Sequence, residues 1–380
     1  MDGLDTAFTA SAQRLDEDWH IVQNLLPEGW QAKARELGAM QRSRGFSDPG
    51  VLLRVLLIHL GQGCSLRETV VRASEGGLIQ VSDVAILKRL RGCGEWFKWM
   101  ADGLRQKWLP EFAPVSPVWA NRRIRLVDGT MVSEPGYTGS QWRLHYSVSL
   151  PALNCDEVIV TTKKEGETLK RYSVAPGDVF IADRGFAQRA GIAHVVEQQG
   201  DVIIRTNLVT LPLHDAKGVR LDVLAYLRTL KVGDAGEWPV WVCHDKKLLA
   251  GRLCAVKKGV VAAQKAADRV RRESQRNGCV LRPETLEAAE YVFVFTTLDK
   301  TVDLQTVLEL YRGRWQIELI FKRLKSLVQL GHLKKHDAVA ARAWLQGKLL
   351  AAFLLDALLE TAERISPWGY QYWAQREKPL

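Results

Sequence analysis

The sequence predicts an α/β protein in which an all-helical N-terminal domain, residues 1–115, precedes a mixed-sheet domain that carries a β-rich insertion. Three observations lead to this fold class. Apolar residues recur at helical spacing early in the chain, as in Val51–Leu60. Pro110, Pro114 and Pro117 then mark a linker. Beyond them, short alternating apolar segments replace the helical pattern, which is typical of strands.

Composition places the chain among ordinary globular proteins. Its 380 residues are 47% hydrophobic and 25% charged, which excludes wholesale disorder. The first 19 residues, MDGLDTAFTASAQRLDEDW, are acidic and lack an apolar core, so we expect no signal peptide. The most apolar stretches, Val51–Leu60 and Leu349–Leu355, are shorter than the roughly 20 residues that span a bilayer. We therefore expect no membrane partner.

Charge and cysteine usage narrow the class further. The chain has 53 Lys and Arg against 43 Asp and Glu, and this net charge of +10 is a weak indication of a polyanionic partner. Six scattered cysteines without C-x-x-C spacing argue against a zinc ribbon. We expect them to be reduced thiols of a cytoplasmic protein.

Capping signals divide the N-terminal domain into short helices. The segment Ser65–Glu68 fits a capping box, and Ser82 is the predicted N-cap of a helix over Asp83–Arg91. That last helix carries Lys88 and Arg89. Two interpretations stay open: a helix that lies in a DNA groove with Lys88 and Arg89 as contacts, or a plain bundle with a solvated basic face.

Residues 118–205 are predicted to form the first part of the mixed sheet. Period-2 alternation predicts consecutive antiparallel strands, and two short apolar runs predict further strands on either side of a helix. The expected strands are Arg123–Val127, Trp142–Leu150, Glu157–Thr161, Val179–Ala182 and Val202–Arg205, and the expected helix is Ala187–Gln199.

Residues 206–287 are predicted to be a β-rich insertion. Its expected strands are Leu221–Tyr226, Trp238–Cys243 and Leu248–Val256. It ends in a very basic helical run, Lys257–Arg276. This run is either a solvated helix face or a strip that faces phosphates.

Residues 288–360 are predicted to complete the sheet domain. We expect a buried strand over Tyr291–Thr296, one long helix over Leu304–Leu330 and an apolar helix over Ala338–Leu359. A tail, residues 361–380, follows.

Two aspartates share a local plan that is typical of catalytic sites. Asp128, in RIRLVDG, and Asp183, in VFIADRG, each stand where an apolar strand is expected to end in a glycine-containing turn. A carboxylate there points from a rigid edge into a crevice. Other carboxylates near these motifs are expected to be in turns or in solvent: Glu134, Asp156, Glu157 and Asp178.

The expected long helix carries polar residues on one face. Tyr311, Arg314, Glu318 and Lys325 are spaced by 3, 4 and 7 residues. At about 100° per residue they fall within roughly a 60° arc. Arg314 and Glu318 can pair as an i,i+4 salt bridge, so this face can also be interpreted as purely structural.

Three carboxylates from two strands and a helix would repel one another if they converged. Binding of divalent cations relieves that repulsion, and oxygen ligands with retained waters suit Mg²⁺. Two such ions can activate a water or a 3′-hydroxyl and stabilise the leaving oxygen of a phosphodiester. Arg314 and Lys325 would then hold flanking phosphates.

These motifs resemble the DDE transposases of the insertion-sequence-4 family. The resemblance covers about residues 40–345 and is carried by LVDGT, IADRGF and the signature Tyr-x2-Arg-x3-Glu-x6-Lys, that is by Asp128, Asp183, Tyr311, Arg314, Glu318 and Lys325.

The resemblance implies an RNase H-like catalytic fold interrupted by the insertion. It implies that Asp128, Asp183 and Glu318 are catalytic and hold two Mg²⁺ ions, with Mn²⁺ able to substitute. It implies that Tyr311, Arg314 and Lys325 contact DNA near the cleaved phosphate. The implied activity is cut-and-paste transposition on double-stranded DNA, at terminal inverted repeats and at a target, by a homodimer in the bacterial cytosol.

Two alternatives remain at this stage. One is a catalytically inactive, DNA-binding relative of a transposase, although a carboxylate trio that faces a polyanion is unfavourable without metal. The other is a hydrolase with paired carboxylates, such as a glycosidase, which leaves Arg314 and Lys325 without a task.

Overall fold

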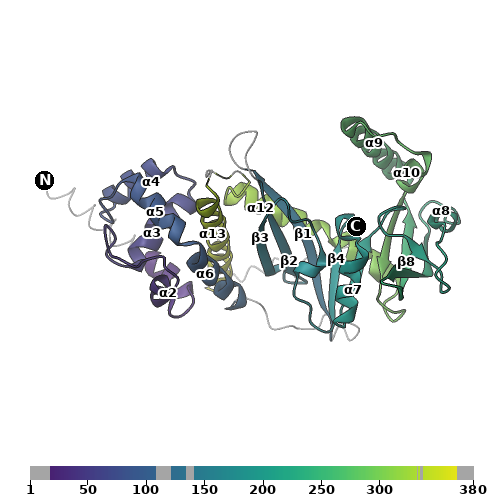
Figure 1. Ribbon diagram of the computed structural model, residues 1–380, viewed down its shortest axis with the longest axis horizontal. Helices are drawn as coiled ribbons and strands as arrows, with labels where there is room; N and C mark the ends of the chain where they lie inside the picture. The colour runs from purple at the N-terminus through teal and green to yellow at the C-terminus, as the bar shows by residue number, and fades with distance from the viewer. Residues whose placement is uncertain (1–17, 108–120, 134–140, 332, 334–336, 366–380) are drawn as a thin grey trace.

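The computed structural model describes residues 18–107, 121–133, 141–331, 333 and 337–365. The linker prolines, Glu134 and residues 366–380 of the tail lie outside this set. Figure 1 shows helices at one end, a large sheet in the middle and a helical projection at the other end. The α/β class with a large mixed sheet is as predicted.

The described residues before the sheet contain helices only. Residues 18–25 are helical, and the helices that follow are α2 (Trp30–Glu36), α3 (Pro49–Gly61), α4 (Leu66–Glu75), α5 (Asp83–Gly92) and α6 (Gly94–Lys107). The predicted caps are confirmed. The hydroxyl of Ser65 accepts from the backbone N–H of Glu68 at 3.1 Å, and that of Ser82 accepts from Ala85 at 3.3 Å. The carboxylate of Glu68 pairs with Arg72 at 2.8 Å, so it does not close the expected capping box.

Helix α13 (Ala338–Ile365) joins the helical end to the sheet. It packs against α3, α5 and α6 on one side and approaches strand β3 on the other. Its stretch Ala338–Thr361 is long and apolar enough to cross a membrane, contrary to the expectation that every apolar stretch is too short. Of the most apolar window in this stretch, however, 72% is buried inside the protein. Core packing therefore accounts for its apolar character.

The sheet has nine strands in the order β3-β2-β1-β4-β5-β9-β8-β7-β6. Strands β3, β2 and β1 are antiparallel, β1, β4 and β5 are parallel, and every pair from β5 onward is antiparallel. The strands are β1 (Arg123–Ser133), β2 (Gln141–Ser149), β3 (Asn154–Thr162), β4 (Asp178–Ala182), β5 (Asp201–Arg205), β6 (Leu213–His214), β7 (Ala235–His244), β8 (Lys247–Lys257) and β9 (Tyr291–Thr296).

Strands from the predicted insertion continue the main sheet. Strand β8 pairs with β9, so β7 and β6 extend the same sheet outward. The strand expected over Leu221–Tyr226 is wrong, because a short helix, α8 (Val223–Leu227), forms there. Asp222 caps it by accepting from the backbone N–H groups of Leu224 and Ala225 at 3.0 and 3.4 Å.

The basic run is helical, as predicted. It forms α9 (Val260–Asn277), which projects from the body of the protein together with α10 (Pro283–Ala288) (Figure 1). Glu273 of α9 lies 3.7 Å from Arg184, the residue directly after Asp183. All 18 residues of α9 are described, and none of them is buried. The helix therefore owes little to core packing.

Helices cover both faces of the sheet. One core contains Leu126 and Ile181 with α11 (Leu304–Gly313), α12 (Trp315–Leu327) and α13, and the other contains Val127 and Phe180 with α7 (Arg189–Glu197) and α8. Since side chains alternate along a strand, residues two positions beyond Leu126 and Ile181 face α11 and α12.

The single helix expected over Leu304–Leu330 is wrong. It is divided into α11 and α12 at Arg314, directly after Gly313. The backbone N–H of Arg314 bonds the carbonyl of Tyr311, and that of Ile317 bonds the carbonyl of Arg314, both at 3.1 Å. These hydrogen bonds, which span three residues as in a 3₁₀-helix, replace the α-helical pattern next to Gly313. Glycine has a low helix propensity.

Candidate active site

Asp128 and Asp183 lie level with each other on neighbouring parallel strands. The register pairs Leu126 with Ile181, so both aspartates come two residues later. Asp183 directly follows β4, as predicted, and its Oδ1 accepts from the backbone N–H of Gly185 at 2.8 Å at the start of a 3₁₀ turn, η3 (Arg184–Phe186). The strand end expected at Asp128 is wrong, because β1 continues past it, paired with β2.

The Asp128 carboxylate is largely buried, with 17% of its side chain exposed. Its Oδ1 accepts from the backbone N–H of Gly129 at 2.7 Å. The pKa of Asp128 is raised to about 7. Burial is the main cause and the negative charge of Asp183 adds to it, whereas the Gly129 hydrogen bond and the charge of Arg314 act to lower the pKa. The site therefore concentrates negative charge near Asp128.

Arg314 connects Asp128 to Glu318. Its Nη1 lies 3.5 Å from Asp128 Oδ2, and its Nη2 donates to a carboxylate oxygen of Glu318. The predicted i,i+4 pair between Arg314 and Glu318 is thus present. The same guanidinium also pairs with Asp128 on β1 and so links the helix to the sheet. Asp128, Asp183, Arg314 and Glu318, which come from β1, the end of β4 and the α11–α12 junction, lie in one region.

Tyr311 and Lys325 border this region. Tyr311 is buried near the end of α11, three residues before Arg314. Lys325 is exposed on α12 and lines a shallow hollow that also includes Glu318 and Thr130. Thr130 lies two residues beyond Asp128 on the same face of β1, so Lys325 is on the rim of the site.

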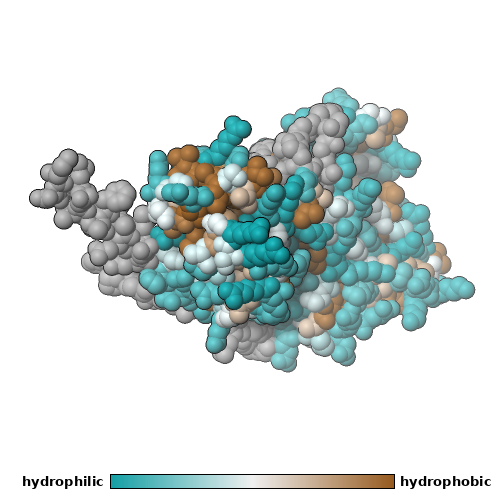
Figure 2. Space-filling view, turned by 60° about the vertical axis from the view of Figure 1, so that its left-hand side comes forward, coloured by the Kyte–Doolittle hydropathy of each residue, from teal (hydrophilic) through white to brown (hydrophobic). Residues whose placement is uncertain are grey.

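Lys88 and Arg89 are not brought to the carboxylates. They lie on α5 at the helical end of the molecule (Figure 1). When this end is turned toward the viewer, the face that is seen is a mixture of hydrophilic and hydrophobic areas (Figure 2). Lys88 is exposed. Arg89 donates to the carbonyls of Arg42 and Arg44 and lies 5.5 Å over the ring of Phe46. These contacts give Arg89 a structural task in addition to any DNA contact.

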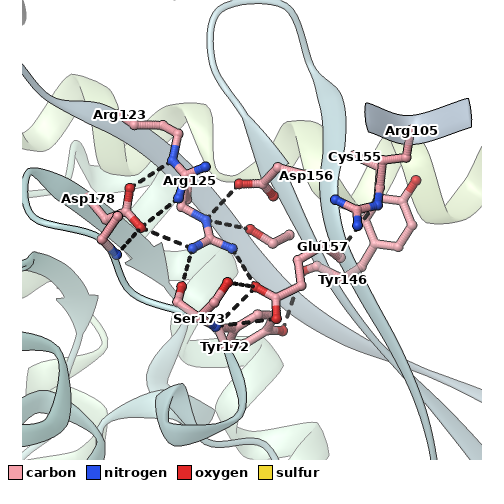
Figure 3. Close-up of polar contacts among 12 residues, drawn as sticks. Arg105, Arg123, Arg125, Tyr146, Cys155, Asp156, Glu157, Tyr172, Ser173 and Asp178 are labelled. Atoms are coloured by element: carbon pink, nitrogen blue, oxygen red, sulfur yellow. Dashed lines mark hydrogen bonds and ion pairs between the residues drawn. The ribbon is translucent and has the colours of Figure 1, made fainter. Parts of the chain in front are cut away.

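A buried charge network surrounds Arg125, which lies three residues before Asp128 on β1 and faces the Phe180 side of the sheet (Figure 3). Arg125 has 1% of its side chain exposed and pairs with Asp156 at 2.7 Å, Glu157 at 2.8 Å and Asp178 at 3.1 Å. Arg123 holds both oxygens of Asp178 at 2.7 Å. The expectation that these three carboxylates are in turns or solvent is wrong. The network ties β1 to β3 and β4, and so supports the register that makes Asp128 and Asp183 level.

Sequence reasoning missed one carboxylate of the site. Glu167 lies between β3 and the 3₁₀ turn η2 (Leu169–Arg171), and burial raises its pKa; the charge of Arg143 lowers it and that of Asp183 raises it. The charge of Glu167 in turn raises the pKa of Asp128. Glu167 belongs to no motif, and its sequence neighbourhood, KKEGET, resembles an ordinary polar loop.

The site residues fit a divalent cation in ligand type and in charge. Carboxylate oxygens are the ligands that Mg²⁺ prefers, and the raised pKa of Asp128 reflects burial together with nearby negative charge. Among the residues that the structure describes, no three His, Cys, Asp or Glu side chains form an assembled metal site. The positive charge of Arg314 lies against Asp128 and Glu318 instead.

Comparison with known proteins places the chain in a family. Residues 161–354 match the family described as "Transposase DDE domain". The chain is 36% identical over 348 residues to "Putative transposase InsL for insertion sequence element IS186A" of Escherichia coli (strain K12), which covers 90% of this chain and 93% of that relative.

Two further relatives agree. The chain is 36% identical over 349 residues to "Transposase for insertion sequence element IS421" of Escherichia coli, with 90% and 93% of the two chains covered. It is 26% identical over 385 residues to "Transposase for insertion sequence element IS231F" of Bacillus thuringiensis subsp. israelensis, with 89% and 79% covered. The chain therefore belongs to the insertion-sequence-4 family of DDE transposases.

Proposed function

We propose that this chain is an active, divalent-metal-dependent transposase. It would bind the terminal inverted repeats of an insertion sequence, cleave the DNA strands and transfer them to a target. The observation that carries the proposal is the grouping of three carboxylates from separate elements. Arg314 pairs with Asp128 and with Glu318, and the charge of Asp183 acts on Asp128. Transposases act on DNA, so double-stranded DNA is the proposed partner.

We assign the domains as follows. Strands β3-β2-β1-β4-β5, with three antiparallel strands followed by two parallel ones, support an RNase H-like catalytic domain over 118–205 and 288–360. Residues 206–287 form the insertion. Residues 1–115 would bind DNA, with exposed Lys88 as the proposed contact and Arg89 as a residue that also supports the loop before α3.

Asp128, Asp183 and Glu318 would hold the Mg²⁺ ions, and Mn²⁺ would substitute because it prefers the same oxygen ligands. Such ions activate the attacking oxygen and stabilise the leaving oxygen of the phosphodiester. Arg314 would hold a phosphate through its paired N–H donors, and exposed Lys325 would add a point charge. Tyr311, one helical turn before Arg314, is the third proposed DNA contact.

The chain would act in the bacterial cytosol as a homodimer, because two ends of the element must be cut together. This oligomeric state is part of the proposal.

The test is strand cleavage in Mg²⁺ on DNA that carries the ends of the element, with wild type, Asp183→Ala and the control Asp245→Ala. Asp245 lies in an exposed turn, with 85% of its side chain accessible. We expect cleavage at the end boundary by wild type and control, and none by Asp183→Ala, with DNA binding retained by all three. Tight binding without cleavage by any of them indicates the inactive relative, and absence of both indicates a different substrate.

A further inference from the structure

Glu167 is a fourth carboxylate at the candidate site, and neither the motifs nor the family match gives it a task. Its Oε1 is 2.6 Å from the position that a Cβ atom of residue 129 would take. Its Oε2 is 2.7 Å from the corresponding position at residue 185. Gly129 directly follows Asp128, and Gly185 lies two residues after Asp183. The carboxylate therefore fills a space that exists because both positions are glycine.

This placement puts Glu167 in the electric field of both aspartates. Its side chain is 26% exposed, and its ion pair with Arg143 has an N–O distance of 3.9 Å. The pair between Arg314 and Asp128 is 3.5 Å long. Both are longer than the ~2.7–2.9 Å of a charge-assisted hydrogen bond. The two arginines therefore balance the charge of Asp128, Asp183 and Glu167 only in part.

We propose that Glu167 is a further residue of the catalytic centre, whose carboxylate helps to hold a divalent cation beside Asp128 and Asp183. The inference rests on the proposed function. Glu167 comes from the loop after β3 and Glu318 from α12, so the two aspartates receive further carboxylates from two different elements. A divalent cation takes carboxylate oxygens directly or through retained water, and it would neutralise the charge that Arg143 and Arg314 leave.

A purely structural role makes a different prediction. In that case Glu167 would only fill the space between the two glycines and pair with Arg143. Removal of its charge would then lower stability and leave cation binding unchanged.

The first measurement is the affinity of the full chain for Mn²⁺ in the absence of DNA. The electron paramagnetic resonance signal of free Mn²⁺ reports how much of the ion is bound. Glu167→Gln keeps the size of the side chain and removes its charge. Glu165→Gln is the matched control, because Glu165 lies two residues away, is 49% exposed and pairs with Arg171 at 3.1 Å. We expect Glu167→Gln to weaken Mn²⁺ binding about tenfold, and the control to bind as wild type does.

The second measurement is the melting temperature in chelator and in Mn²⁺. Without cation, Glu167→Gln should melt no lower than wild type, because one of three repelling charges is gone. Addition of Mn²⁺ should raise the melting temperature of Glu167→Gln less than that of wild type, because a ligand stabilises the native state more when it binds more tightly. Lower melting in chelator together with wild-type Mn²⁺ affinity would overturn the inference in favour of the structural role.

Asp183→Asn separates this inference from the proposed function. If Asp183→Asn loses Mn²⁺ affinity and Glu167→Gln does not, the inference on Glu167 fails and the proposed metal site stands. If Asp183→Asn binds Mn²⁺ as wild type does, the metal assignment of the proposed function fails, and the inference fails with it.

Discussion

At the scale of single residues, the raised pKa of the buried Asp128 carboxyl predicts that the stability of the protein in chelator depends on pH. Burial and Asp183 raise its native pKa to about 7, whereas an unfolded aspartate titrates near ~4. Between these values the native state binds more protons than the unfolded state. The free energy of unfolding should therefore fall as pH rises from about 4 to 7, by at most about 1.4 kcal/mol per pH unit for this proton.

Urea unfolding at pH 5, 6 and 7 checks this expectation. Asp128→Asn carries no titrating proton at this position, so its stability should vary less with pH over the same range. An equal slope in wild type and Asp128→Asn would show that other groups cause the dependence.

Arg314 leads to a prediction on DNA binding. If its guanidinium holds a phosphate, Arg314→Ala should reduce the slope of log affinity against log salt by about one. Arg228→Ala is a suitable control, because Arg228 pairs with Glu287 at 2.7 Å on the insertion. Filter binding or gel shifts over a range of salt would measure both slopes, and an unchanged slope in Arg314→Ala would exclude the phosphate contact.

Sequence motifs could identify Asp128, Asp183, Arg314 and Glu318, because each has a distinctive local pattern. They could not identify Glu167 or the partners of Arg125. Those contacts join segments 18 to 53 residues apart in the chain, and they depend on how β1 is placed against β4 and, through β2, against β3. The sequence around Glu167 does not indicate that its side chain packs against Gly129 and Gly185.

At the scale of elements, the Arg125 network fixes β1 against β3 and β4. Arg125→Met should lower the free energy of unfolding by about 3–5 kcal/mol, because it leaves Asp156 and Asp178 buried without this partner. Arg123→Met is the matched control: its side chain is 37% exposed, and Arg125 still pairs with Asp178 in that variant. Urea unfolding should give a smaller loss for the control, and equal losses would contradict a central role for Arg125.

Helix caps were predictable from sequence because they depend on neighbouring residues, as at Ser65 and Ser82. The strand expected over Leu221–Tyr226 is wrong for a different reason: the apolar pattern of so short a segment fits a strand or a helix, and Asp222 caps a helix there. The division at Arg314 follows Gly313. Apolar periodicity alone does not register such a local interruption.

At the scale of the whole molecule, one hydrophobic core runs from the N-terminal helices through α13 into the sheet. Gly347 of α13 lies where helices approach closely: a Cβ atom there would be 2.4 Å from Leu60 and 3.1 Å from Phe97. Gly347→Val should destabilise the protein by about 1–3 kcal/mol through overpacking. Gly61→Val is the control, because residue 61 is also helical and no neighbour lies within 4 Å of its added Cβ atom.

Since the N-terminal helices and the sheet share this core, Gly347→Val should lower the stability of both parts. Tryptophan fluorescence and far-ultraviolet circular dichroism should give coincident transitions in urea, shifted together in Gly347→Val. A shift in only one signal would mean that the helical end unfolds independently. The sequence separates these parts by a proline-rich linker and gives no sign that residues near the end of the chain return to pack on α3 and α6.

The two margins of the sheet have a consequence for assembly. At one margin β6 is only two residues long, and at the other β3 is covered by α6 and α13. Strand β6 pairs only with Trp241 and Val242 of β7, and the stretch of β7 that it leaves uncovered contains Pro239, which has no N–H to donate to a strand of another molecule. A proline on such an edge disfavours indiscriminate strand pairing between molecules. Two copies that meet on DNA would have to recognise each other through side chains on helices and loops, where surface charge and the bound nucleic acid can control their encounter.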